Sequence, residues 1–174
     1  ARRWAMAASA AGDAEANVVL WHIHAEGLGV PADEAEAARW IEKAALAGDA
    51  DAMYRLSTLH HEGKGVEQSD AQAMVWLRAA AEAGHAAAQR GLGVAYMSGS
   101  GVPVDEQEGV RWLRAGAEGG DARAQSMYGR ALAEGRGTEP DPEAGVEWLV
   151  RAADQGATAA AAALGTLYLE GRGG

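Results

Sequence analysis

Residues 76–112 read WLRAAAEAGHAAAQRGLGVAYMSGSGVPVDEQEGVRW and run from one tryptophan to another 36 residues later. The same interval separates five tryptophans along the chain, at Trp4, Trp40, Trp76, Trp112 and Trp148. Glycine keeps this interval in two further series, Gly12, Gly48, Gly84, Gly120 and Gly156, and Gly27, Gly63, Gly99, Gly135 and Gly171. A fixed period of this length is typical of stacked supersecondary units, so the sequence predicts a repeat architecture.

Each period has the pattern of two helices joined by a glycine turn. The first helix is expected to begin at position 13, 49, 85, 121 or 157, where an aspartate in three copies can accept from free backbone N–H groups. It ends at a turn with two glycines, such as EGKGV at 62–66 or EGRGG at 170–174, because glycine readily adopts left-handed backbone angles. The second helix begins near Asp33, Ser69 or Asp70, Asp105 and Asp141. We therefore expect ten helices, with the tryptophans buried between neighbours.

The period divides the chain into full and half repeats. The full repeats are predicted at residues 13–48, 49–84, 85–120 and 121–156. Residues 1–12 correspond to the second helix of a repeat and residues 157–174 to the first helix of another, and we expect a single solenoid over residues 1–174. Because the chain begins at Ala1 inside a repeat, a mature form or an excised fragment is expected. The half repeats leave apolar faces bare, which predicts head-to-tail self-association through both ends.

The chain is strongly acidic, with 25 Asp and Glu residues against 15 Lys and Arg, a formal net charge of −10 and a pI of about 4.9. Nucleic-acid binding is not expected, because it needs a basic surface. Direct membrane insertion is not expected either, since no apolar run approaches the roughly 20 residues that cross a bilayer. The absence of cysteine excludes thiol chemistry but leaves cytoplasmic and exported locations open. The abundance of Ala, Gly and Arg suggests a bacterial gene.

One unit carries a complete motif, Ala-x-x-x-Leu-Gly-x-x-Tyr, then Gly-x-Gly-Val, an Asp, and a Trp followed by Ala and Gly. Its residues are Ala88, Leu92, Gly93, Tyr96, Gly99, Gly101, Val102, Asp105, Trp112, Ala117 and Gly120. This pattern resembles the SEL-like repeat (SLR) family, a relative of the tetratricopeptide repeat, and the resemblance covers the whole chain. It implies a right-handed α/α superhelical solenoid whose first helices line a concave surface that holds other proteins. The departures from the pattern, which we expect to shift helix packing, are Trp21 and Ser57 for Gly, His24, His60 and Leu132 for Tyr, and Tyr128 for Leu.

The first helices carry a second stripe of residues, opposite the apolar positions that pack. It starts at positions 15, 18, 22 and 25 and is repeated at intervals of 36. The candidate partner-binding residues on this stripe are Tyr54, Thr58, His61, Arg90, Val94, Met97, Arg123, Ser126 and Arg130. Tyrosine and arginine dominate interface energies, and an arginine fork suits a carboxylate. We hypothesise that the groove binds an acidic or C-terminal peptide segment; the alternative is that the exposed arginines only make the helix face soluble.

No motif in the sequence indicates an enzyme. There is no GxSxG, no phosphate-binding Gly-Lys-Ser/Thr, and no glycine motif that follows a strand. The histidines lack the i, i+4 spacing of a helical metal site, and His24 and His60, one period apart, are expected to pack in the tyrosine position. No metal and no cofactor is predicted. The predicted function is a non-catalytic scaffold or adaptor that binds a peptide or protein segment in the concave groove; the alternative is an enzyme or ligand-binding module that recognises cell-wall fragments.

Overall fold

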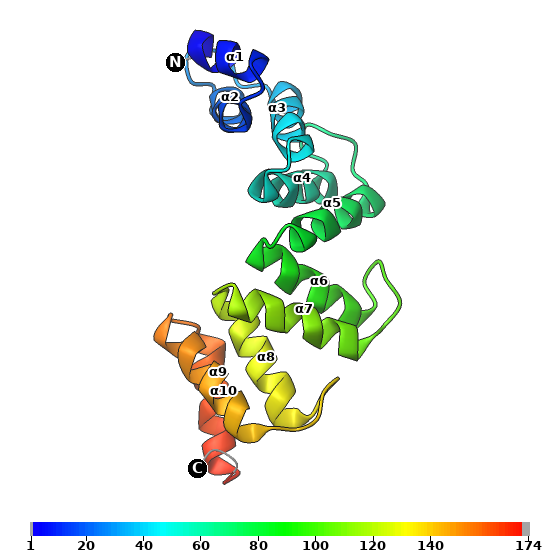
Figure 1. Cartoon of the computed structure of the whole chain (residues 1–174), viewed down its shortest axis with the longest axis vertical. Helices are drawn as coiled ribbons and strands as arrows, with labels where there is room; N and C mark the ends of the chain where they lie inside the picture. The colour runs from blue at the N-terminus through cyan, green and yellow to red at the C-terminus, as the bar shows by residue number, and fades with distance from the viewer. Residues whose placement is uncertain (1, 172–174) are drawn as a thin grey trace. The chain divides into compact units, whose positions relative to one another are not determined.

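The computed structural model describes residues 2–171, which form ten α-helices and no strand (Figure 1). The helices are α1 (Arg2–Ala10), α2 (Ala14–Glu26), α3 (Glu34–Leu46), α4 (Ala50–Glu62), α5 (Asp70–Glu82), α6 (Ala86–Ser98), α7 (Glu106–Glu118), α8 (Ala122–Glu134), α9 (Pro142–Asp154) and α10 (Thr158–Leu169). The predicted all-α architecture of helix-turn-helix repeats is confirmed. The chain divides into two compact units, with residues 1–83 in unit 1 and residues 84–174 in unit 2. A single solenoid over the whole chain stays a prediction.

Side chains cap the first helix of each full repeat. The carboxylates of Asp49 and Asp121 accept from the backbone N–H three residues later, at 2.8 and 2.7 Å. His85 takes the same role through its Nδ1, which accepts a 3.1 Å bond from the N–H of Ala88. Each cap satisfies an N–H group that the first turn of a helix leaves free. By contrast, α10 begins after Ala157, which offers no side-chain acceptor, so its first turn has no such cap.

The two glycines of each turn have different roles. The first ends the helix with a left-handed backbone, at φ between 69° and 77°. In two turns the second glycine lies against the second helix of the preceding repeat: a Cβ at Gly65 would overlap the carbonyl oxygen of Glu34, and one at Gly137 would overlap that of Glu106. Contact between repeats therefore requires the second glycine, in addition to its own positive φ. The turn predicted at 170–174 lies mostly outside the described residues.

Within unit 2, the two helices of a repeat approach closely at paired glycines. A Cβ on Gly93 of α6 would lie 2.9 Å from the carbonyl oxygen of Gly109 in α7, and one on Gly109 would lie 3.0 Å from the oxygen of Gly93. Gly129 of α8 and Gly145 of α9 make the same reciprocal contact, at 2.8 and 2.7 Å. In unit 1 the corresponding first-helix residues are tryptophan and serine. The reciprocal glycine contact therefore occurs only in unit 2 among the described repeats, and a shift of the helices in unit 1 stays a prediction.

The largest fully buried side chains are aliphatic. They are Leu20, Ile41, Leu56, Leu92, Leu113 and Leu149. Among the five periodic tryptophans, Trp40 is buried at 8% exposure, Trp4 is 74% exposed and the other three are partly buried. The prediction that all of them are buried between neighbours is therefore wrong. Trp40 is enclosed in part by the side chain of Lys43, whose ammonium lies 3.8 Å from the centroid of the ring.

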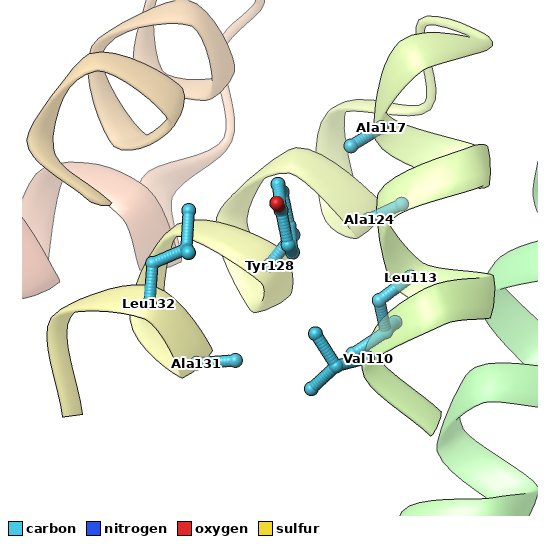
Figure 2. Packing of buried hydrophobic residues seen from close by; sticks show 7 residues of the cluster. All are labelled: Val110, Leu113, Ala117, Ala124, Tyr128, Ala131 and Leu132. Atoms are coloured by element: carbon cyan, nitrogen blue, oxygen red, sulfur yellow. The ribbon is translucent and has the colours of Figure 1, made fainter. Parts of the chain in front are cut away.

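Neighbouring repeats share a core where the second helix of one meets the first helix of the next. Figure 2 shows this contact in unit 2, where Val110 and Leu113 of α7 face Ala131 and Tyr128 of α8. Trp148 of α9 also packs on Tyr128, with the ring centroids 5.6 Å apart in an edge-to-face arrangement. The tyrosine that replaces the expected leucine therefore joins three helices in one cluster.

We predict that Gly65→Ala destabilises unit 1 clearly more than Gly29→Ala does. Both glycines have positive φ, of 69° and 76°, so an alanine at either costs about 1–2 kcal/mol of backbone strain. At Gly29 a Cβ would meet open space, whereas at Gly65 it would overlap the Glu34 carbonyl group, which adds about 1–3 kcal/mol of overpacking. Urea unfolding followed by circular dichroism measures the difference, and equal losses for the two variants would contradict the contact between repeats.

Candidate functional site

The predicted partner-binding residues lie on α4 in unit 1 and on α6 and α8 in unit 2. Their exposure is uneven. Thr58, His61, Arg123 and Arg130 are exposed, Tyr54, Arg90, Val94 and Met97 are partly buried, and Ser126 is buried at 5% exposure. The expectation that the whole stripe faces outward is therefore wrong for Ser126. Its place in the period lies close to the neighbouring repeat, where a small side chain is enclosed.

The polar residues of this stripe on α4 already have partners within unit 1. The hydroxyl of Thr58 donates to the backbone carbonyl of Tyr54 at 3.2 Å, a bond internal to the helix. The Nδ1 atom of His61 lies 2.8 Å from a carboxylate oxygen of Asp70 at the start of α5. Both side chains of that pair are largely exposed, so the pair contributes little to stability.

Arg90 joins two repeats inside unit 2. Its Nε donates to Asp121 at 3.0 Å, and the two side chains are only 21% and 16% exposed. The same carboxylate oxygen of Asp121 caps α8 by accepting from the N–H of Ala124 at 2.7 Å. Arg90 therefore stabilises the junction of α6 and α8 and does not present a free guanidinium, which corrects its predicted role as a carboxylate-binding fork.

The surface between α8 and α10 is hollowed. A cavity of about 420 Å³ is lined by Arg123, Ser126, Met127, Arg130, Gly156, Ala157, Thr158 and Ala159. Its only charged lining side chains are the two arginines. Within residues 2–171, Arg123 has no acidic side chain at ion-pair distance, and Arg130 has a long, exposed pair with Glu134 at 3.4 Å. The cavity therefore carries positive charge in a chain that is acidic as a whole.

The uncapped end of α10 adds to this positive charge. Ala157 to Ala159 line the cavity, and the first turn of α10 has no side-chain acceptor for its N–H groups. A helix N-terminus bears a partial positive charge and favours anions. Every other first helix in residues 2–171 has an aspartate or histidine cap at this position.

Two further cavities continue the hollow, and Arg130 lines all three. One, of about 480 Å³, lies along the later turns of α8 and α10 and is lined by Arg130, Ala133, Glu134, Ala159, Ala162, Ala163, Thr166, Leu167 and Glu170. The other, of about 110 Å³, is lined by Met97, Leu113, Met127, Arg130, Ala131, Glu134 and Arg136. We refer to the three cavities together as the α8–α10 groove.

The structure brings part of the predicted site together. Met97, Arg123, Ser126 and Arg130 line the groove, whereas Arg90 and Val94 do not. Sequence reasoning missed the α10 side of the groove, although one more translation by 36 residues reaches Ala159, Ala162 and Thr166. It also missed Met127, because this residue is not one of the stripe positions that the period selects.

The acidic residues that precede the glycine turns take part in local ion pairs. Glu62 lies 2.6 Å from the ammonium of Lys64, and this hydrogen bond and its charge raise the pKa of Lys64 above its usual value. Glu26 lies 3.6 Å from His22. Across residues 2–171, no group of three or more His, Asp or Glu side chains is placed to hold a metal ion. In the same part of the chain, every helix is too short or too polar to cross a membrane.

We predict that Arg90→Ala lowers the free energy of unfolding by about 1–2 kcal/mol, because it removes a charged hydrogen bond and leaves Asp121 partly buried without its partner. Arg111→Ala is the matched control. Arg111 pairs with Glu108 at 2.7 Å, but its side chain is 77% exposed, so the loss should stay below about 0.5 kcal/mol. Urea unfolding of both variants tests this, and equal small effects would argue against a structural role for Arg90.

Comparison with known proteins agrees with the repeat geometry. The Sel1 repeat model matches residues 14–49, 50–85, 86–121, 122–156 and 158–174. The chain is similar to a Sel1 repeat protein from Oxalobacter formigenes, with 37% identity and a TM-score of 0.84 over 98% of this chain and 70% of that one. It is also similar to a protective antigen of uropathogenic Escherichia coli that displays an SLR fold, with 32% identity and a TM-score of 0.85 over 97% of this chain but 36% of that one. No curated protein matches it. The matches to the family model cover nearly all of the chain, and the chain therefore belongs to the Sel1 repeat family.

Proposed function

We propose that this Sel1 repeat protein is an interaction scaffold that binds an acidic peptide segment, or the C-terminal carboxylate of a partner, in the α8–α10 groove. The observation that carries the proposal is the cavity of about 420 Å³ whose charged lining consists of Arg123 and Arg130. Sel1 repeats commonly mediate protein interactions, which agrees with a binding role. The carboxylate specificity comes from the residues of this chain.

A carboxylate suits this cavity for two reasons. Arginine offers planar N–H donors that match the two oxygens of a carboxylate, and such charge-assisted bonds are among the strongest in proteins. The first turn of α10 also lacks the aspartate or histidine cap of the equivalent helices. The N–H of Ala160 already donates to the Ala157 carbonyl at 2.9 Å, so an incoming carboxylate can accept from the N–H groups of Thr158 and Ala159. The ligand would supply the group that Ala157 cannot.

The shape of the groove favours an extended chain over a compact ligand. The cavities of about 420, 480 and 110 Å³ meet at Arg130, so a peptide can continue along α8 beyond the carboxylate site. Alanine is the commonest of the other lining residues, Glu134 and Glu170 line the cavity of about 480 Å³, and Met97 and Met127 line the cavity of about 110 Å³. Methionine adapts its shape to varied apolar partners, which suits recognition of a peptide side chain. A contribution of Tyr54, Thr58 and His61 to partner binding stays a prediction.

Fluorescence polarisation of a labelled peptide of Ala, Leu and Glu with a free C-terminus tests the proposal. We predict that Arg123→Ala with Arg130→Ala weakens binding at least about tenfold, roughly 1.4 kcal/mol, because both carboxylate partners are lost. The charge-matched control is Arg111→Ala with Arg114→Ala, which removes two exposed arginines of α7 outside the groove and should leave affinity within about twofold. The same peptide with Gln for Glu and an amidated end should not bind. Equal affinities for the two double variants would refute the groove as the site.

Ala157→Asp tests the role of the uncapped helix. We predict that this substitution raises the free energy of unfolding by about 0.5–1 kcal/mol, since it restores the cap found in the equivalent helices. It should also weaken binding of the acidic peptide, because the new carboxylate occupies the N–H groups and repels the ligand. The control Gln107→Glu adds the same charge in the exposed first turn of α7 and should change peptide affinity little. A gain in stability with unchanged affinity would place the ligand elsewhere.

A further inference from the structure

We propose that the bound peptide carries an aliphatic side chain about three residues away from its carboxylate, and that this side chain enters the cavity of about 110 Å³ between α6 and α8. The inference rests on the proposed function, because it adds a second contact to the same peptide. We call this cavity the methionine pocket, since Met97 of α6 and Met127 of α8 line it. It lies wholly within the repeats of unit 2.

The floor of the methionine pocket is the buried core between two repeats. Leu113 of α7 is fully buried and Ala131 of α8 is 4% exposed, and both belong to the cluster in Figure 2. Met97 packs against that cluster from α6. Met127 is 38% exposed, so one wall of the pocket is open to a guest. An apolar side chain that enters here therefore contacts the core directly and covers an exposed methionine.

The volume of the pocket suits one aliphatic side chain. An apolar cavity of roughly 150 Å³ is large enough to bind benzene. The methionine pocket is smaller, at about 110 Å³, so it has room for a side chain of leucine or methionine size but not for an aromatic ring. Volume alone therefore predicts a preference between apolar peptides.

The two methionines set this volume. One period later their equivalents are Ala133 and Ala163, which line the larger cavity of about 480 Å³ between α8 and α10. Two periods before Ala131, the same place in α4 is occupied by Leu59, which packs against the core of unit 1. The period thus allows a larger or smaller side chain at each of these places, and the combination at the methionine pocket leaves room for one guest side chain.

The carboxylate site and the methionine pocket lie on opposite sides of α8. The carboxylate site uses α8 from Arg123 to Arg130 and the start of α10. The pocket uses α8 from Met127 to Glu134 and the end of α6. The shift of four residues along α8 corresponds to about 6 Å, and a step across one helix to about 8–10 Å. An extended peptide advances about 3.3 Å per residue, so about three residues join the two contacts.

The charges around the pocket agree with an acidic peptide. Its charged lining residues are Arg130, Glu134 and Arg136, so arginines outnumber the single carboxylate. Arg136 is held at 2.7 Å by Glu106 of α7. Arg130 lines both the pocket and the carboxylate site, so one side chain borders both contacts. A peptide whose carboxylate lies on the arginines therefore passes the mouth of the pocket.

Fluorescence polarisation with labelled peptides of sequence Ala-Ala-Xaa-Ala-Ala-Glu and a free C-terminus tests the pocket, with Leu, Ala or Phe at Xaa. The leucine peptide should bind the wild-type protein about tenfold more tightly than the alanine peptide, because it buries a larger aliphatic side chain. The phenylalanine peptide should stay within about twofold of the alanine peptide, since the ring does not fit. A peptide with leucine next to the glutamate should bind like the alanine peptide, and tight binding of that peptide would contradict the spacing.

Two variants change the pocket in opposite directions. Ala131→Leu fills it with the side chain that Leu59 provides in α4, so this variant should bind the leucine and alanine peptides equally. Met97→Ala with Met127→Ala widens it to the alanines of the next repeat, so the preference should move from leucine to phenylalanine. Circular dichroism verifies folding, and if Ala131→Leu does not fold, the methionine double variant tests the pocket by itself. Val150→Leu is the matched control, because it enlarges a residue of α9 that lines none of the three cavities and should keep the wild-type preference.

The outcomes separate this inference from the proposed function. If the wild-type protein binds the leucine and alanine peptides equally, the pocket is wrong and the carboxylate site stands. A leucine preference that persists in folded Ala131→Leu, or that stays unchanged in the methionine double variant, would also overturn the pocket. If none of the peptides binds the wild-type protein, the proposed function fails and the pocket fails with it.

Discussion

Close approach of helix backbones, made possible by glycine and alanine at fixed places in the period, is the constraint on which the rest of this structure depends. In unit 2, paired glycines bring a carbonyl oxygen of each helix to within contact of the other, with no side chain between them. The deepest large side chains of both units are Leu and Ile, and four of the five periodic indole rings are partly or largely exposed. Gly65 and Gly137, the second glycines of two turns, apply the same constraint between successive repeats.

Each repeat packs only against its immediate neighbours, so the same exposed helix face recurs in every repeat, as the same buried contact does. A first helix packs on its own second helix and on the helix before it, and its remaining face borders the next first helix. In unit 2 that face forms the α8–α10 groove.

The three arginines of the predicted stripe differ in role because their neighbours in the next repeat differ. Arg90 meets the capping aspartate of α8, so its charge is satisfied within the chain. Arg123 and Arg130 border α10, whose N-cap residue is Ala157, and they line a cavity that contains no carboxylate. The N-cap residue therefore makes the difference: Asp121 turns the end of α6 and α8 into a structural junction, whereas Ala157 leaves a candidate binding site between α8 and α10.

The sequence by itself determined the ten helices, their caps and glycine turns and the stripe of first-helix residues, because a repeated period imposes the same local backbone and helical face on every copy. It also determined that Met97, Arg123 and Arg130 share that stripe. Only the tertiary structure decided which stripe residues are exposed and unpaired, since Ser126 is buried and Arg90 is paired with Asp121 of the following repeat. Arg90 and its partner Asp121 lie 31 residues apart in the sequence. Periodicity places both residues on their helices, but it does not say whether their side chains meet or stay exposed.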